Sequence, residues 1–207
     1  MTPTILAVFA VAEEVVPLSI SGWNVISIVT GIGKTQAAMH LAKAILEYQP
    51  QCVVNIGTAG TLRHRVGDIL LSREYIDRDF QQIQLPGLGF HLENTFPLPP
   101  TIQEIFQRMQ QEATSAHAIV STGDNFVTDN SHVTADMVDM EGFALAAVCQ
   151  ELRVPLFSVK YITDIIGQNS VEDWAAKLQH ARAALTKFLD QTIGKSNRHK
   201  TTSRTYL

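Results

Sequence analysis

Short, almost wholly apolar runs alternate along the chain with longer stretches whose apolar residues recur every three or four positions. The first pattern predicts strands buried on both faces, and the second predicts helices with one buried face. Strands are expected at residues 5–10, 25–29, 52–56, 69–71, 117–121 and 155–162. Helices are expected at residues 35–48, 102–112, 142–152 and 171–193. This alternation indicates an α/β sandwich around a mainly parallel or mixed sheet.

Glycine and proline mark the interruptions of this pattern. Gly31 and Gly33 break the chain before the first helix, and Gly57 and Gly60 predict a turn after the third strand. Between residues 75 and 100 the periodicity fails among prolines and glycines, which predicts a long irregular segment of the kind that forms lids or binding loops. Because no repeat or linker divides the chain, residues 1–194 are expected to form a single domain.

Composition adds limits on the class of protein. The chain has 207 residues, 45% of them hydrophobic, which suits one domain with a sizeable core. The net charge of −4 provides no field that would attract nucleic acid or an acidic membrane. Residues 195–207 carry four cations and no acid, so they are predicted to form a disordered basic tail. A basic arm for an anionic partner is the alternative.

Neither cysteine belongs to a metal or disulfide motif. Cys52 and Cys149 lie in apolar surroundings without a second cysteine nearby, which predicts buried thiols in a reducing cytoplasm. The apolar start is short and is followed at once by Glu13 and Glu14, which argues against a signal peptide or a membrane span. The seven histidines show no ligand spacing, so no metal is expected, and no cofactor either.

The sequence Thr-Gly-Ile-Gly-Lys-Thr at residues 30–35 has the ending of a phosphate-binding P-loop but lacks its beginning. The full motif needs a glycine five positions before its last one, and Ile28 stands there. A nucleoside triphosphatase is therefore disfavoured. The glycine turn still precedes a helix, and a helix N-terminus favours an anion or a polar oxygen.

Three acidic residues stand at the ends of predicted elements with apolar neighbours. Asp139 and Glu141 come where a helix begins, and Asp164 comes where a strand is expected to end. Buried carboxylates need a partner, such as a ligand hydroxyl or a shared proton. The alternative is that Asp139 caps the helix and Asp164 is a turn residue. Their joint occurrence with the segments below favours a ligand site.

Five segments occur in an order and at a spacing found in a known family. They are Ala-Val-Ala-Glu-Glu at 10–14, Thr-Gly-Ile-Gly-Lys at 30–34, Asn-Ile-Gly-Thr-Ala-Gly at 55–60, Ser-Thr-Gly-Asp-Asn-Phe-Val at 121–127, and Val-Asp-Met-Glu at 138–141 with Thr-Asp at 163–164. Over roughly residues 5–166 the chain resembles the nucleoside phosphorylase/nucleosidase family, and within it the 5′-methylthioadenosine/S-adenosylhomocysteine nucleosidases. The resemblance implies a three-layer α/β/α sandwich with a central mixed sheet, and a purine nucleoside as ligand.

The resemblance also assigns roles to acidic side chains. Asp164 matches the acid that protonates or hydrogen-bonds N7 of the purine, for which its pKa would have to lie near the working pH. Glu14 matches the base that deprotonates the attacking water, in preference to Glu13. Glu141 matches the carboxylate that accepts hydrogen bonds from the two ribose hydroxyls and supplies negative charge near the developing cation.

Further positions match substrate-binding residues. Met140 would pack under the ribose, Phe126 would stack on the base, and the backbone of Val127 would contact the base edge. Thr58 would hold the nucleophilic water or an anion in its place. The alternatives are that Met140 and Phe126 belong to the core and that Thr58 forms a turn.

The chain departs from the family pattern in ways that concern the substrate more than the reaction. Thr58 and Thr163 replace serines, and Asp139 replaces a glutamate beside the ribose site. Fifteen residues separate Glu14 from Thr30, where the family has a longer stretch with a β-hairpin. The pocket for the group on the ribose 5′ position is therefore expected to be reshaped.

Water is the favoured nucleophile. Related phosphorylases carry an arginine where this chain has Asn55, and residues 11–18 contain no cation that could grip phosphate. Arg63, His64 and Arg65 keep a purine nucleoside phosphorylase open as an alternative. The others are a futalosine hydrolase, suggested by the shortened N-terminal region, and a non-catalytic nucleoside-binding relative.

The resemblance implies a homodimer in which a loop of one subunit closes the pocket of the other. The proline- and glycine-rich stretch at residues 85–100 is the candidate loop, with Phe90, His91 or Phe96 reaching across.

Overall fold

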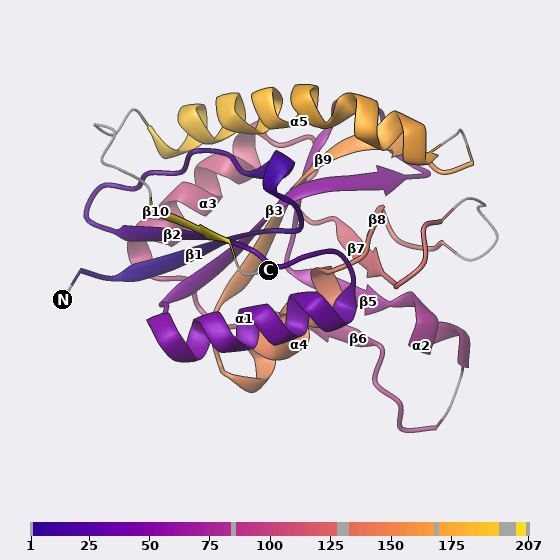
Figure 1. Cartoon of the computed structure of the whole chain (residues 1–207), viewed down its shortest axis with the longest axis horizontal. Coiled ribbons are helices and arrows are strands. Elements are labelled where there is room, and N and C mark those ends of the chain that lie inside the picture. The colour runs from indigo at the N-terminus through magenta and orange to yellow at the C-terminus, as the bar shows by residue number, and fades with distance from the viewer. Residues whose placement is uncertain (1, 84–85, 128–132, 168–169, 195–201, 206–207) are drawn as a thin grey trace.

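The computed structural model describes residues 2–83, 86–127, 133–167, 170–194 and 202–205. They form a ten-stranded sheet with helices on both faces (Figure 1). The strands are β1 (Thr4–Phe9), β2 (Asn24–Val29), β3 (Cys52–Thr61), β4 (Ile69–Ser72), β5 (Glu74–Asp77), β6 (His91–Glu93), β7 (Ile119–Thr122), β8 (Met137–Asp139), β9 (Leu156–Ile165) and β10 (Thr202–Thr205). The helices are the 3₁₀ turn η1 (Ala12–Glu14), α1 (Lys34–Tyr48), α2 (Arg78–Ile83), α3 (Pro100–Glu112), α4 (Gly142–Glu151) and α5 (Ser170–Ile193).

The sheet is mixed, as predicted. Its main path runs β10-β2-β1-β3-β8-β7-β5-β6, and β9 pairs with both β3 and β4. The pairs β1–β2, β1–β3, β3–β9, β5–β7 and β7–β8 are parallel, whereas β3–β8, β4–β9 and β5–β6 are antiparallel. Strand β3 lies at the branch of the sheet, and all ten of its residues are buried.

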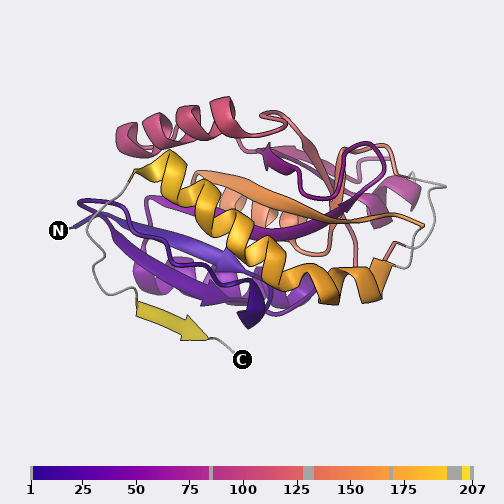
Figure 2. The same cartoon turned by 90° about the horizontal axis from the view of Figure 1, so that it is seen from above.

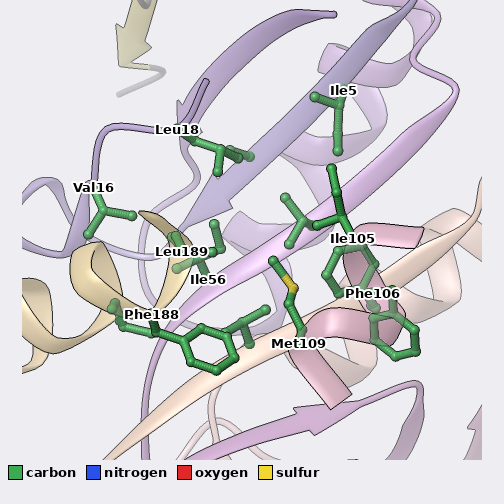
Figure 3. Close-up of a cluster of buried hydrophobic side chains, with 14 of the residues drawn as sticks. Ile5, Val16, Leu18, Ile56, Ile105, Phe106, Met109, Phe188 and Leu189 are labelled. Carbon is green, nitrogen blue, oxygen red and sulfur yellow. The ribbon is translucent and has the colours of Figure 1, made fainter. Parts of the chain in front are cut away.

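Two hydrophobic clusters fill the space between the sheet and its helices. Helices α3 and α5 cover one face, where Ile5, Ile56, Phe106, Met109 and Leu189 pack together (Figure 3). Helices α1 and α4 cover the other face. Residues in β1 alternate between the two clusters because successive side chains of a strand point to opposite faces, and this explains the continuous apolar run in the sequence.

Two strands are longer than predicted. Strand β3 continues through Gly57 and Gly60 without a turn, and β9 continues past Asp164 to Ile165. The two strands pair in parallel along this extra length, which satisfies their backbone hydrogen bonds. Glycine inside a strand commonly marks a close approach of other groups, and both glycines lie under side chains of the site described below.

The segment at residues 75–100 contains more regular structure than predicted. Strand β5, helix α2 and strand β6 occupy part of it, and β6 pairs with β5 at the end of the sheet. These elements are short and their burial is mixed, so they leave little periodicity in the sequence.

The C-terminal residues also differ from the expectation. Of the predicted disordered tail 195–207, residues 202–205 form β10 and pair with β2 at the edge of the sheet (Figure 2). The unpaired N–H and C=O groups of an edge strand explain why β2 accepts a further strand. The other residues of this tail lie outside the described residues.

Both cysteine thiols are free and buried, as predicted. Among the described helices, none combines the length and the apolar character that a bilayer span would require.

Candidate functional site

A cavity opens at the carboxyl ends of the strands. The empty space within it is about 770 Å³, a figure that includes space open to solvent. Its wall is formed by Ala10, Glu14, Ile32, Thr58, Ala59, Gly60, Arg78, Asn125, Phe126, Val127, Val138, Asp139, Met140, Glu141 and Asp164. The carboxyl edge of an open α/β sheet is a recurrent place for ligands, because the loops that follow the strands converge there.

Eight of the nine residues predicted for the site line this cavity. The exception is Thr163, which is fully buried and contacts Asp164 instead. Phe126 is 37% exposed, so it belongs to the cavity wall and not to the core. Met140 is only partly buried at the same wall.

Glu14 lies over strand β3 in the 3₁₀ turn that follows β1. Its Oε1 accepts hydrogen bonds from the Thr58 N–H at 2.8 Å and from the Thr58 hydroxyl at 2.6 Å. A Cβ on Gly57 would lie 3.0 Å from Oε2 of Glu14, so the carboxylate occupies space that a larger residue would take. The neighbouring Glu13 is exposed, which agrees with the choice of Glu14.

Asp164 is held at the opposite end of the same stretch of β3. A register shift in the β3–β9 pairing places it beside Gly60, where a Cβ would lie 2.7 Å from its Oδ2. The Thr163 hydroxyl donates a hydrogen bond to Oδ1 of Asp164 at 2.8 Å. Glycine at position 60 therefore lets the Asp164 carboxyl, which is 3% exposed as a residue, reach the cavity.

Glu141 precedes helix α4 and meets the glycine turn before α1. Its Oε1 accepts a hydrogen bond from the Gly33 N–H at 3.0 Å, so this amide faces a carboxylate of the protein. Burial raises the pKa of Glu141 to about 7, and the negative charges of Asp139 and Glu14 add to this effect, while Lys160 and the Gly33 N–H oppose it. Glu141 therefore titrates near neutral pH.

Asp139 is engaged by donors of the protein itself. Oδ1 accepts a hydrogen bond from the Thr122 hydroxyl at 2.6 Å, and both oxygens accept from the Gly142 N–H at 3.0–3.1 Å. Asp139 thus satisfies the first N–H of α4, as the capping alternative held, although the N-cap residue itself is Glu141. Oδ2 of Asp139 also pairs with the Lys160 ammonium at 3.2 Å.

Lys160 pairs with a residue of the cavity wall, and its sequence position was not recognised as part of the candidate site. It lies inside β9 and is 2% exposed. Burial opposes its charge, yet the combined fields of Asp139, Glu141 and Glu14, with the hydrogen bond to Asp139, raise its pKa. A lysine within a mainly apolar, buried strand was the available signal, because such a lysine needs a buried carboxylate as a partner.

Replacing Lys160 by methionine is expected to destabilise the fold by about 3–5 kcal/mol, because Asp139 would remain buried without its cation. Urea-induced unfolding of both proteins measures this change. Lys43→Met on the exposed side of α1 is the matched control and should cause a change within about 0.5 kcal/mol. Equal losses from the two substitutions would contradict the prediction.

Arg78, the first residue of α2, is the second residue that was missed. It lines the cavity although it is only 5% exposed. Its guanidinium donates to the backbone carbonyls of Ser121, Gly123 and Asn125 on one segment and of Asp139 on another. It lies in the stretch that was expected to be irregular, and nothing in that local sequence indicates a buried cation.

Lys34, the lysine of the incomplete P-loop motif, is also paired within the protein. Its ammonium lies 3.0 Å from Asp77 and 2.7 Å from Asp79, and its backbone N–H donates to Asp124 at 2.7 Å. These contacts tie the start of α1 to the segment that carries Phe126. Among residues 30–35, Ile32 is the one that lines the described cavity.

Two further groups of candidate residues lie outside the cavity wall. Arg63, His64 and Arg65 do not line it, and His64 lies 3.7 Å from Asp136. The residues proposed to reach across a dimer, Phe90, His91 and Phe96, do not line the cavity of their own chain either. Among the described residues, no group of three or more His, Cys, Asp or Glu side chains could hold a metal ion.

The chain matches the family model described as the phosphorylase superfamily over residues 10–194. It is 29% identical over 191 residues to the 5′-methylthioadenosine/S-adenosylhomocysteine nucleosidase of Bacillus cytotoxicus, which covers 83% of this chain and 81% of that protein. A Helicobacter pylori nucleosidase mutant with 5′-methylthioadenosine in its active site superposes with a TM-score of 0.78, at 20% identity over 93% of this chain and 99% of that one. The H. pylori futalosine hydrolase superposes with a TM-score of 0.77, at 20% identity over 93% and 97% of the two chains.

Proposed function

Since the chain belongs to the phosphorylase superfamily, we propose that it is a purine nucleoside N-glycosidase that hydrolyses 5′-methylthioadenosine/S-adenosylhomocysteine-type nucleosides to the free base and a ribose derivative. One observation carries the proposal. Glu14, Glu141 and Asp164 come from distant parts of the chain and line one cavity. Phe126 and Met140 line it as well, and they suit a base and a sugar face.

Asp164 is the acid for the departing base in this proposal. A purine leaves more readily when its N7 is protonated or accepts a strong hydrogen bond, because negative charge then does not build up on the ring. Oδ1 of Asp164 accepts a hydrogen bond from the Thr163 hydroxyl at 2.8 Å. The position of Asp164 at the cavity wall makes its carboxyl the group that meets the base.

Glu14 is the base for the attacking water. Two donors from Thr58 converge on its Oε1 and fix the carboxylate at the cavity wall. In this arrangement Thr58 orients the general base, and Oε2 is the oxygen that takes the proton from water.

Glu141 is the carboxylate for the ribose hydroxyls. Ionised, it accepts hydrogen bonds from them and places negative charge near the sugar as it becomes cation-like. Asp139 fixes the turn in which Glu141 lies, because it forms a salt bridge with Lys160 and accepts a hydrogen bond from the Gly142 N–H.

Water is the nucleophile that the charges of the cavity favour over phosphate. Arg78 is the one basic residue among those lining the described cavity, and its Nη1 and Nη2 donate to backbone carbonyls. Lys160 lies behind the wall and pairs with Asp139, and the amide of Asn55 donates to Ser158 at 3.2 Å. Phosphate binding would call for free cationic donors at the wall.

An assay of base release tests this function. The purified protein is incubated with 5′-methylthioadenosine, S-adenosylhomocysteine, futalosine and inosine, each with and without phosphate. Release from the two adenosine derivatives that does not depend on phosphate supports the proposal. A strict requirement for phosphate identifies a phosphorylase, a preference for futalosine identifies a futalosine hydrolase, and no release from any of the four refutes the proposal.

Gly60→Ala is expected to lower kcat by about 10²-fold, because the added methyl group would displace the Asp164 carboxyl, from which it would lie only 2.7 Å away. Gly89→Ala is the matched control, since a Cβ there meets nothing within 4 Å. Base-release kinetics with both variants measures the difference. If Gly60→Ala kept the wild-type kcat, the position of the Asp164 carboxyl would not determine the rate of base release.

We also propose that the enzyme is a cytoplasmic homodimer. The two free, buried thiols fit a reducing compartment. Ile32 at the cavity wall and Met39 on α1 are large apolar residues with 48% and 53% exposure, and a second subunit would cover such residues. Light scattering on the eluting protein tests the oligomeric state.

A further inference from the structure

Arg78 joins two segments that are far apart in the sequence. One nitrogen of its guanidinium donates to the Ser121 carbonyl at 2.9 Å and to the Asp139 carbonyl at 3.0 Å. A second nitrogen donates to the carbonyls of Gly123, at 3.1 Å, and Asn125, and the third, Nε, is buried with no hydrogen-bond partner among the described residues. The Gly123 N–H adds a direct hydrogen bond to the Asp139 carbonyl at 3.3 Å.

The two segments carry different parts of the proposed binding site. The carbonyls of Ser121, Gly123 and Asn125 lead directly to Phe126, which is proposed to stack on the base. The Asp139 carbonyl comes two residues before Glu141, which is proposed to bind the ribose. A shift of either segment would therefore change the distance between the two parts of the nucleoside site.

Among the described residues no carboxylate forms a direct ion pair with the guanidinium, although the negative charges of Asp139, Asp79, Asp77 and Asp124 favour its charged form. An ideal Cβ on Gly123 would lie 2.6 Å from Nε and 2.7 Å from Cζ of Arg78, so the two are in close contact. Burying a cation without an ion pair is costly, and an apolar residue would fill the same space with less cost. The planar guanidinium offers instead several donors with fixed directions, which an apolar side chain lacks.

We propose that Arg78 is a positioning residue that holds the base-stacking segment and the ribose-binding segment of the cavity in a fixed relation to each other. The inference rests on the proposed function and deepens it. It assigns to Arg78 no contact with the reacting atoms.

Arg78→Met tests the inference, with Arg73→Met as the matched control. Arg73 is also partly buried and donates to the carbonyls of Leu156 and Phe96, but it does not line the cavity. For Arg78→Met we expect KM to rise and kcat to fall, each by about tenfold or more. The reason is that a shift of the substrate-binding segments by about 1 Å can lower the rate by about 10²-fold. Arg73→Met is expected to lower the melting temperature and to leave KM unchanged.

Two further variants separate positioning from stability. Arg78→Lys keeps the charge but has no planar fork, so it should restore only part of the loss in KM. Arg78→Ala leaves space for free guanidinium, which should lower KM again when added at millimolar concentration, whereas added methylammonium should restore less. Both variants are assayed below their melting temperatures, which are measured by thermal unfolding.

The affinity for free adenine, measured by calorimetry, gives a result that does not depend on turnover. We expect Arg78→Met to weaken it by about tenfold or more, because the aromatic wall is no longer fixed. A lowered melting temperature with unchanged KM and unchanged adenine affinity would overturn the inference, as would equal effects of the Arg73 and Arg78 variants. If the wild-type protein binds adenine but releases no base, the proposed function fails while the adenine comparison still decides the role of Arg78.

Discussion

Replacing Glu14 by glutamine is expected to lower kcat for base release by about 10³-fold and to leave the affinity for the free base within about twofold. The amide oxygen of glutamine can still accept the hydrogen bonds from the N–H and hydroxyl of Thr58, so the side chain keeps its place. It cannot take a proton from water at neutral pH. Steady-state kinetics and calorimetric titration with adenine measure the two effects separately.

Glu13→Gln is the control for this substitution. It removes the same charge from the neighbouring position, but Glu13 is exposed and does not line the cavity. Its turnover should therefore match that of the wild-type protein. A Glu14→Gln variant with full turnover would exclude Glu14 as the base. A variant that also loses adenine binding would show that Glu14 contributes to the structure of the site and not only to the proton transfer.

Replacing Glu141 by glutamine is expected to have opposite effects on stability and on activity. The pKa of Glu141 is raised from 4.5 to about 7 in the folded protein. The folded state therefore holds this proton more tightly than the unfolded state. The associated stability is fully present below pH 4.5 and is lost as the pH rises to about 7.

Above that pH the ionised carboxylate destabilises the wild-type protein by about 3 kcal/mol relative to the protonated form. Glutamine does not ionise, so Glu141→Gln should unfold at a higher urea concentration than the wild type at about pH 8. The difference should shrink toward zero as the pH approaches 4.5. Glu104→Gln, on the exposed side of α3, is the control and should show no such dependence on pH.

The activity of Glu141→Gln should fall by about 10²-fold in kcat/KM, because a neutral amide accepts the ribose hydrogen bonds less strongly than a carboxylate does. In the wild type, kcat/KM should rise as the pH increases through about 7, where Glu141 ionises. This rise should be absent from the variant. A variant that is both less stable at about pH 8 and fully active would contradict both parts of the prediction.

The segments of the site could be predicted from the sequence, but their contacts could not. Glu14, Glu141 and Asp164 stand in segments with a recognisable order, and all three line the cavity. The partner of Glu141, the Gly33 N–H, lies 108 positions away in the chain. A glycine turn before a helix predicts an anion or a polar oxygen at that place, and only the fold shows that the oxygen belongs to Glu141.

Lys160 and Arg78 show why part of the site was missed. The local sequence gives no sign of the role of Arg78, and for Lys160 the only local sign is a lysine in a mainly apolar strand. Lys160 interrupts an apolar strand, and Arg78 begins a helix of six residues. A buried cation is explained by the groups that surround it, and these come from other strands. Local periodicity contains no information about them.

The sequence by itself determined the alternation of strands and helices, and its motifs predicted a mixed sheet and the acidic residues that line the cavity, because burial patterns and motifs are properties of neighbouring positions. The tertiary structure decided that β3 and β9 continue through Gly60 and Asp164. It also decided that Thr163 contacts Asp164 and does not line the cavity. Lys160 and Arg78 contact Asp139 at the cavity wall, and only the fold shows these contacts. The physical reason is that strand pairing and the solvation of buried charges depend on which distant segments meet, and only the packed fold brings those segments together.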